Sequence, residues 1–215
     1  MKIVLLVLSF SFSLLSAGQV KIVNESLSDS TVDYFYIGVD NKVSISGIPA
    51  DGQKFSVMAT GATQMRIATG VYIIRVNSVT DSCRLIISAD GKIIATRIYK
   101  VRILPPPIAV IGTLNTRDTV TVEELLADAR LKVELPGCYF KHDMQVTDYM
   151  FVISKAKVME DIYQKPSHGH QLSSWERDQI LNCKPGAQIV VDKIILNNRK
   201  TGNYSLPPII LTIKE

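Results

Sequence analysis

Three consecutive prolines, Pro105, Pro106 and Pro107, are the feature that most limits how this chain can fold. Proline fixes φ near about −65° and lacks an N–H donor, so such a run cannot lie inside a central strand. It forms a stiff extended segment that advances about 3.1 Å per residue. The run therefore predicts a linker at 105–108 between a first domain at 19–104 and a second at 109–215. A docking motif for a proline-recognising partner is the alternative interpretation.

Short β-prone runs fill the first domain, and they alternate between apolar and polar positions as half-buried strands do. Between two of these runs lies Asp90-Gly91, a dipeptide that favours a type I′ hairpin because both residues tolerate positive φ. The stretch from Gly38 to Asn41 also predicts a turn, because Asp and Asn side chains form hydrogen bonds with their own backbone. The strands predicted here are 34–37, 43–45, 54–59, 64–67, 71–76, 84–88 and 92–103.

The second domain mixes two short helices with strands predicted at 131–135, 145–154, 188–197 and 208–213. Thr121 is an N-cap followed by acidic residues, and Ser173 with Glu176 forms a capping box. Trp175 is interpreted as the core anchor of the second helix. Neither domain has the regular helix–strand alternation of a parallel α/β enzyme. The predicted fold class is therefore mainly β, with two consecutive immunoglobulin-like or β-sandwich domains.

The first residues, MKIVLLVLSFSFSLLSAGQ, indicate the compartment. One lysine precedes an apolar run from Ile3 to Ala17, which is shorter than the roughly 20 residues that span a bilayer. Small residues follow the run, as they do at a cleavage site. The pattern predicts a signal peptide at 1–18 and a mature protein that is exported and not stably inserted in a membrane; an uncleaved anchor is the alternative.

The net charge of +4 is spread over dispersed lysines and arginines. Phosphate binding needs concentrated positive charge, so the sequence does not predict a nucleic-acid partner.

Motifs that would carry chemistry are weak. His168-Gly169-His170 could offer two imidazoles to a metal, but no further ligands are evident nearby. The simpler interpretation is a solvated turn, in a loop that also contains Pro166 and Ser167. His142-Asp143 lacks a neighbouring nucleophile. The sequence contains no nucleophile elbow, P-loop or dinucleotide fingerprint after a strand. We therefore expect no catalytic residues, no cofactor and no metal.

Three cysteines, Cys83, Cys138 and Cys183, leave at least one thiol unpaired in an oxidising compartment. Cys138 and Cys183 are the only pair within one predicted domain and are the candidate disulfide. The alternative is that all three are small buried hydrophobic residues that keep their thiols.

Several motifs in order resemble one known family. The stretch YIGVDNKVSISGIP at 36–49, VRILPPPI at 101–108, LSSWERDQIL at 172–181 and LPPII at 206–210 resemble the two C-terminal periplasmic domains of the GldM/PorM family. That family belongs to the gliding-motility and type IX secretion machinery. The resemblance implies a non-catalytic structural or adaptor protein of the periplasm, a homodimer, and contact with a ring or another component at the outer membrane.

Family members begin with an inner-membrane helix and a long periplasmic segment, whereas here a short export signal precedes the similar region. The chain therefore resembles a standalone copy of the distal half. The alternative function is a secreted β-sandwich module that binds a surface polymer or a host protein. Secretion and peripheral attachment at the outer membrane are the alternatives to a free periplasmic location.

Unpaired edge strands are the expected means of binding, because a second chain can satisfy their N–H and C=O groups. The segments next to turns, 36–46 and 206–213, are the predicted edges. The interface residues predicted on them are Tyr36, Val43, Ile45, Ile209, Leu211 and Ile213.

Overall fold

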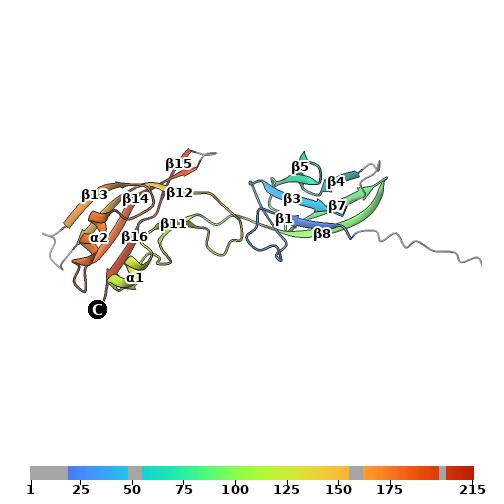
Figure 1. The fold of residues 1–215 in the computed structure, drawn as a ribbon. Helices are drawn as coiled ribbons and strands as arrows, with labels where there is room; N and C mark the ends of the chain where they lie inside the picture. Colours follow the sequence, from blue (N-terminus) through green and yellow to red (C-terminus); the bar gives the residue numbers. More distant parts are fainter. Residues whose placement is uncertain (1–18, 48–54, 155–161, 199–201) are drawn as a thin grey trace, which may run out of the picture. The chain divides into compact units, whose positions relative to one another are not determined.

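The computed structural model describes residues 19–47, 55–154, 162–198 and 202–215, and the predicted signal peptide at 1–18 lies outside them. The chain divides into two compact units, Met1–Arg102 and Ile103–Glu215, and each is described by itself. Both units are built mainly from β-strands (Figure 1), which confirms the predicted mainly-β fold class with packed sheets. In the described part of the chain, no helix is long and apolar enough to cross a membrane.

The first unit packs two four-stranded sheets against each other. Sheet I has the order β1-β3-β6-β5 and sheet II the order β2-β8-β7-β4. All neighbours are antiparallel except β2 and β8, which are parallel. The strands are β1 Lys21–Asn24, β2 Tyr34–Tyr36, β3 Asn41–Ser46, β4 Phe55–Ala59, β5 Ala62–Ala68, β6 Val71–Val76, β7 Ser82–Ala89 and β8 Lys92–Arg102.

Alternate side chains of both sheets meet in the core of this unit, as the period of two predicts. Phe35 and Tyr99 stack with their ring centroids 3.9 Å apart. The buried side chain of Asn41 accepts the Tyr36 N–H (2.9 Å) and donates to the Tyr36 carbonyl (3.0 Å) and the Ile74 carbonyl (3.1 Å). The predicted turn before β3 is confirmed, with Gly38 at φ 76°. Asn41 therefore ties this turn to the core.

The predicted Asp90-Gly91 hairpin joins β7 to β8. Asp90 has φ 47° and Gly91 has φ 77°, which are the two positive angles of a type I′ turn. The hairpin sets the antiparallel register of the two longest strands in sheet II, from Ala89 opposite Lys92 to Ser82 opposite Lys100.

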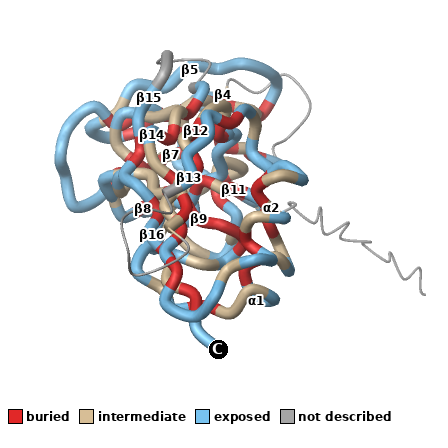
Figure 2. The backbone as a smooth tube through the Cα atoms, turned by 90° about the vertical axis from the view of Figure 1, so that its left-hand side faces the viewer, coloured by how far each residue is buried: buried red, intermediate tan, exposed pale blue. Residues whose placement is uncertain are grey.

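The second unit covers one large sheet with a two-stranded ribbon and two helices. Sheet III has the order β10-β16-β14-β12-β13, with β15 pairing the far end of β14, and the ribbon pairs β9 with β11. Buried side chains of sheet III, the ribbon and both helices share one core, and buried and exposed positions can be followed along the strands in Figure 2. The strands are β9 Ile108–Ile111, β10 Thr119–Val120, β11 Leu131–Glu134, β12 Gln145–Ser154, β13 Ile162–His168, β14 Gln188–Asn198, β15 Gly202–Leu206 and β16 Ile209–Ile213.

Both helices begin at capping boxes. Helix α1 (Val122–Ala127) starts after Thr121, and α2 (Ser174–Leu181) starts after Ser173, the N-cap predicted from the sequence. In each case the N-cap hydroxyl accepts the N3 backbone N–H and the N3 glutamate accepts the N-cap N–H. Trp175 packs on the core, with its ring 6.2 Å edge-on from that of Phe151. Its predicted anchoring role is confirmed.

Two segments differ from the sequence interpretation. The residues Pro166, Ser167 and His168, interpreted as part of a turn, belong to strand β13, and the turn begins at Gly169 with φ 88°. Proline fits there because β13 is the last strand of its sheet. In the predicted linker at 105–108, Ile108 is already the first residue of β9, so the segment without regular structure is 103–107.

Candidate interaction surface

The first predicted edge, 36–46, lies inside the first unit. Strand β3 pairs with β1 on one side and β6 on the other, so its backbone groups are already used. Val43 is fully buried, and Ile45 and Tyr36 are 5% and 1% exposed. Strand β3 is therefore not an edge that a second chain could extend. Tyr36 belongs to the terminal strand β2, where its N–H and carbonyl are bonded to the Asn41 side chain.

The second predicted edge, β16, is covered by the chain itself. The Thr212 N–H donates to the Asp118 carbonyl (3.0 Å), and the Ile210 carbonyl accepts the Arg117 N–H (2.6 Å). Because N–H groups alternate along a strand, the Leu211 N–H points the other way, toward Ile189 of β14. The side chains of Ile209, Leu211 and Ile213 are buried in the core. A proline substitution at Leu211 would therefore remove an N–H that pairs β16 with β14, so it would disrupt sheet III and could not test for a contact with a second chain.

The candidate disulfide is not formed in the structure, where all three cysteines carry thiols. The Cys138 sulfur accepts the Phe140 N–H (3.3 Å), and the Cys183 thiol donates to the Gln179 carbonyl (3.4 Å). Cys83 lies in the core of the first unit, and burial raises the pKa of its thiol. Of the three cysteines, Cys83 is buried as the alternative interpretation expects, whereas Cys138 and Cys183 are only partly buried.

The histidines occupy surface positions. His168 contacts the carboxylate of Asp148, its cross-strand neighbour, and this hydrogen bond lowers the pKa of the Asp148 carboxyl. Partial desolvation of the exposed His142 side chain lowers its pKa, and the charge of Asp143 opposes that shift. Across the described ranges, no group of three His, Cys, Asp or Glu side chains could hold a metal ion.

An open groove in the second unit is lined by several charged side chains that bond to one another or to nearby backbone groups. Asp128 bonds to Arg130 (2.6 Å) and to Lys132 (2.6 Å), and these partners hold the pKa of its carboxyl well below the usual range. The Arg177 side chain donates to the Leu172 carbonyl, so it also has a local role. The groove is lined by Leu126, Ala127, Asp128, Ala129, Arg130, Gln171 and Arg177.

The edge strand β13 is protected against pairing. The N–H of Gly169, the residue after β13, donates to the Thr147 carbonyl (2.6 Å). Every second residue before Gly169 therefore also directs its backbone N–H and C=O groups toward β12. Gln164, Pro166 and His168 consequently face outward. Pro166 has no N–H to offer a partner at the middle of this edge, which is a common way of protecting an edge strand.

Strand β5 is the terminal strand at one end of sheet I. The Ile45 N–H donates to the Gly70 carbonyl (2.7 Å), so the backbone groups of even-numbered residues on β6 face β3 and those of odd-numbered residues face β5. The β5 residues opposite these odd-numbered residues, Thr63 and Met65, therefore direct their backbone groups toward β6. The N–H and C=O groups of Gln64 and Arg66 therefore point away from sheet I, and no described strand pairs with them. β5 has seven residues and no proline, and all but its first are exposed.

Sequence reasoning recognised β5 only as the run 64–67 and did not identify it as an edge. A signal was present, because the segment lies between Gly61 and Gly70 and places polar or charged residues at 63, 64 and 66. Such a strand buries little of itself and fits an edge better than a centre.

The protein is mainly β, and its candidate binding surfaces are the edges of strands and the outer faces of sheets. Residues 26–102, nearly all of the described first unit, match the family model described as the GldM third domain. The first unit therefore carries a GldM-like domain, and the resemblance inferred from the sequence is confirmed for this part of the chain. No curated protein matches the sequence.

Solved structures of low identity also align with the chain. The adhesin InvE of Yersinia pseudotuberculosis is 11% identical with a TM-score of 0.30, covering 91% of this chain. This chain spans 58% of the adhesin chain. The tandem Ig repeats of Dlar are 11% identical (TM-score 0.28; 92% and 99% of the two chains), and titin A168169 is 6% identical (TM-score 0.26; 90% and 99%). These values carry no inference about ligands or partners.

Proposed function

We propose that this protein is a non-catalytic structural or adaptor protein of the periplasm that acts by binding other proteins. The observation that carries the proposal is the GldM third domain match over residues 26–102, in a unit whose β5 edge offers unpaired backbone groups. The gliding and type IX secretion machinery, with a ring or another component at the outer membrane, is the assembly in which we place it. The two units act as separate domains joined by the proline segment, and the N-terminal residues direct export.

The first partner we propose is a second copy of the chain, paired through β5. Two antiparallel β5 strands would join two copies of sheet I into one continuous sheet under two-fold symmetry. Along β5, Ala62, Gln64 and Arg66 present outward backbone groups before the register shift between Arg66 and Ala68, so the central pairs must join even-numbered residues. A two-fold axis at Met65 joins Gln64 with Arg66 of the partner subunit, rather than arginine with arginine, and leaves Ala62 outside these central pairs.

Proline substitution tests this pairing. Gln64→Pro removes an outward N–H that the folded monomer does not use, so we expect the fold to remain and the dimer to dissociate. The matched control is Gln164→Pro, which removes an outward N–H from the protected edge β13 and should leave the dimer intact. Light scattering across a concentration series measures the mass of each mature protein. A monomeric wild type, or a Gln64→Pro variant that dimerises normally, contradicts pairing through β5.

A cysteine at the axis tests the register. Directly opposite residues in a non-hydrogen-bonded antiparallel pair have Cα atoms about 4.5 Å apart, a separation that a disulfide can span. Met65→Cys should therefore form a cross-linked dimer on mild oxidation, whereas Thr63→Cys, displaced from the axis, should not. Equal cross-linking of the two variants would refute this register.

The proposed location is tested separately. Fractionation of cells that express the full-length protein should place it in the periplasm, with about 17 to 19 residues removed from its N-terminus as for a cleaved signal peptide. Full-length chain in the membrane fraction would contradict export as a cleaved protein.

A further inference from the structure

The outer face of sheet II carries a cluster of apolar side chains that lie outside the hydrophobic core. Met58 lies opposite Ile86 across β4 and β7, and Ile98 is a diagonal neighbour of Ile86 on β8. Met58 and Ile98 are 53% and 54% exposed. Ile93 and Ile94 extend the cluster where the β7–β8 register shifts. Outward positions of a sandwich are usually polar, and a contiguous exposed apolar patch marks an interaction site.

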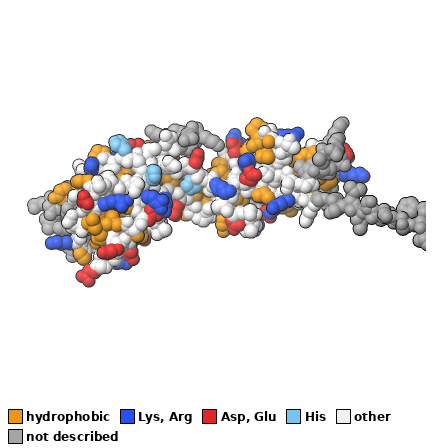
Figure 3. Space-filling view, viewed as in Figure 1, with side chains coloured by type: hydrophobic (Ala, Val, Ile, Leu, Met, Phe, Trp, Pro, Cys, Tyr) orange, Lys and Arg blue, Asp and Glu red, His pale blue; other side chains and the backbone are white. Residues whose placement is uncertain are grey.

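Two cations lie beside this cluster without acidic partners. Arg84 is directly opposite Ile98, and Lys100 follows two residues later on the same face. Strands β4, β7 and β8 contain no Asp or Glu, and among the described residues no carboxylate pairs with either cation. Two cations of sheet I differ, since Lys42 pairs with Glu25 and Arg75 with Asp40. On the molecular face shown in Figure 3, Lys and Arg side chains lie scattered among hydrophobic, acidic and other side chains.

Charge complementarity decides what could cover this face. A second copy of the same face would bring Arg84 and Lys100 against their own equivalents, and like charges disfavour such a contact. An anionic lipid surface usually attracts clusters of about four to eight basic residues. This face carries three, Arg84, Lys100 and Arg102, and Arg102 lies over the Tyr34 ring. Met and Arg are enriched at protein interfaces. The occupant that fits is a protein segment with carboxylates beside apolar side chains.

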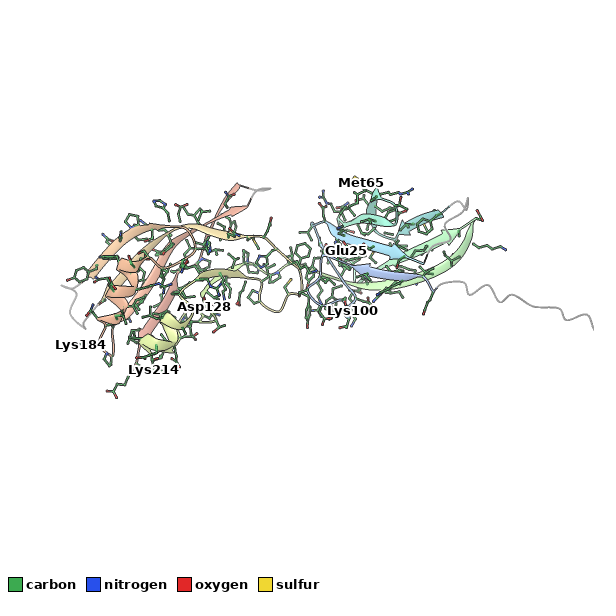
Figure 4. The ribbon with its side chains drawn as sticks, viewed as in Figure 1. Glu25, Met65, Lys100, Asp128, Lys184 and Lys214 are labelled. Carbon is green, nitrogen blue, oxygen red and sulfur yellow. The ribbon has the colours of Figure 1, made fainter. Side chains whose placement is uncertain are left out.

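We propose that the outer face of sheet II, centred on Met58, Ile86 and Ile98 and flanked by Arg84 and Lys100, binds an acidic protein segment that carries apolar side chains. The proposal rests on the role in protein binding stated above, but it is independent of pairing through β5. In Figure 4, Met65 of β5 and Lys100 of β8 lie on opposite sides of the first unit. A dimer formed through β5 therefore leaves the outer face of sheet II accessible.

A short synthetic peptide of alternating Val and Glu serves as the probe, and the same peptide with Lys in place of Glu serves as its control. Fluorescence anisotropy measures binding to the mature protein, and vesicles of phosphatidylglycerol provide the lipid comparison. We expect the acidic peptide to bind. Arg84→Glu combined with Lys100→Glu should weaken this binding by about tenfold or more. Ile98→Ser should weaken it by about three- to tenfold through the loss of apolar contact.

Control variants separate this face from general charge and hydrophobicity. Lys184→Glu with Lys214→Glu makes the same change of net charge in the second unit, at the two lysines labelled in Figure 4. Val79→Ser removes an apolar side chain that is 80% exposed outside the cluster. Both should bind the acidic peptide within about twofold of the wild type, a difference of about 0.4 kcal/mol.

The proposal is overturned if the acidic peptide does not bind, if the Lys peptide binds equally, or if the double reversal at Arg84 and Lys100 has no effect. Vesicle binding that depends on the same two cations would indicate a lipid surface and would also overturn it. Circular dichroism checks that each variant folds, and Arg84→Gln with Lys100→Gln provides a milder pair if the reversal does not. Light scattering on the same samples reports the dimer independently, so failure of β5 pairing and failure of this proposal are distinguishable.

Discussion

The hydroxyl of Tyr149 lies 3.0 Å from the Oε2 atom of Glu176, and both side chains are buried in the second unit. The same carboxylate also accepts the Ser167 hydroxyl and the Ser173 N–H. Three donors from β12, β13 and the N-cap of α2 therefore converge on one buried glutamate. A buried carboxylate is tolerated only when donors surround it in this way. Glu176 both completes the capping box of α2 and attaches that helix to sheet III.

Removing one of these donors should weaken the second unit. Tyr149→Phe deletes the hydroxyl while keeping the ring in the core, and hydrogen bonds to charged groups contribute about 1.5–3 kcal/mol. We expect the free energy of unfolding to fall by this amount, measured by urea denaturation followed by tryptophan fluorescence of Trp175. The control is Tyr204→Phe at a side chain that is 51% exposed, which should change stability by less than about 0.5 kcal/mol. Equal effects of the two substitutions would contradict the role of the Tyr149 hydroxyl.

Tyr99 in the first unit should respond in the opposite direction. Its hydroxyl is buried and has no hydrogen-bond partner among the described residues. Tyr99→Phe removes this unsatisfied group and preserves the stack on Phe35. We expect stability to rise by about 1 kcal/mol, because the desolvation cost of the hydroxyl disappears. Urea denaturation followed by far-UV circular dichroism measures the change, and a loss of stability would show that the hydroxyl has a partner in solution.

Alkaline pH should destabilise the first unit through the same residue. Burial, opposed by Arg97, raises the pKa of Tyr99 to about 12, above the value of about 10 in an unfolded chain. A group whose pKa is raised on folding contributes stability that is complete below the unfolded pKa and is lost as the pH rises. Stability should therefore decline between about pH 10 and 12. Tyr99→Phe should flatten this part of the profile, and an unchanged slope would rule out Tyr99 as its source.

Local signals in the sequence predicted local structure well. Asp90-Gly91 forms the expected hairpin, and Ser173 with Glu176 forms the expected capping box, because these patterns act within a few residues. Pro166 was misread for the same reason. A proline suggests a loop, and its compatibility with β13 depends on β13 being the last strand of its sheet and on the outward direction of residue 166.

The interaction surface was harder to predict because it depends on which strands are neighbours. Val43 and Ile45 are central only because β1, about twenty residues earlier in the chain, pairs with β3. Leu211 appears available in the sequence, yet segment 116–120 covers one side of its strand and β14 the other. The exposed edge at Gln64 and Arg66 follows from the register of β5 on β6, which no local pattern specifies.

Gly112 is a position where backbone conformation and packing both require glycine. Its φ is +62°, and a Cβ there would lie 2.7 Å from the backbone oxygen of Asp128. The Gly112 N–H donates to the Arg130 carbonyl (2.8 Å), so the two segments cannot separate without losing this bond. Gly112→Ala should therefore lower the free energy of unfolding of the second unit by about 3 kcal/mol, combining the positive-φ cost with a backbone clash.

The matched control for Gly112→Ala is Gly137→Ala. Gly137 has nearly the same backbone angle, φ +64°, but an added Cβ would meet nothing within 4 Å. Only the positive-φ cost of about 1 kcal/mol applies there. Urea denaturation followed by the fluorescence of Trp175 compares the two variants in the same unit. Similar losses at both positions would show that the close approach of Gly112 to Asp128 adds nothing to the cost, and that backbone angle alone explains the requirement for glycine.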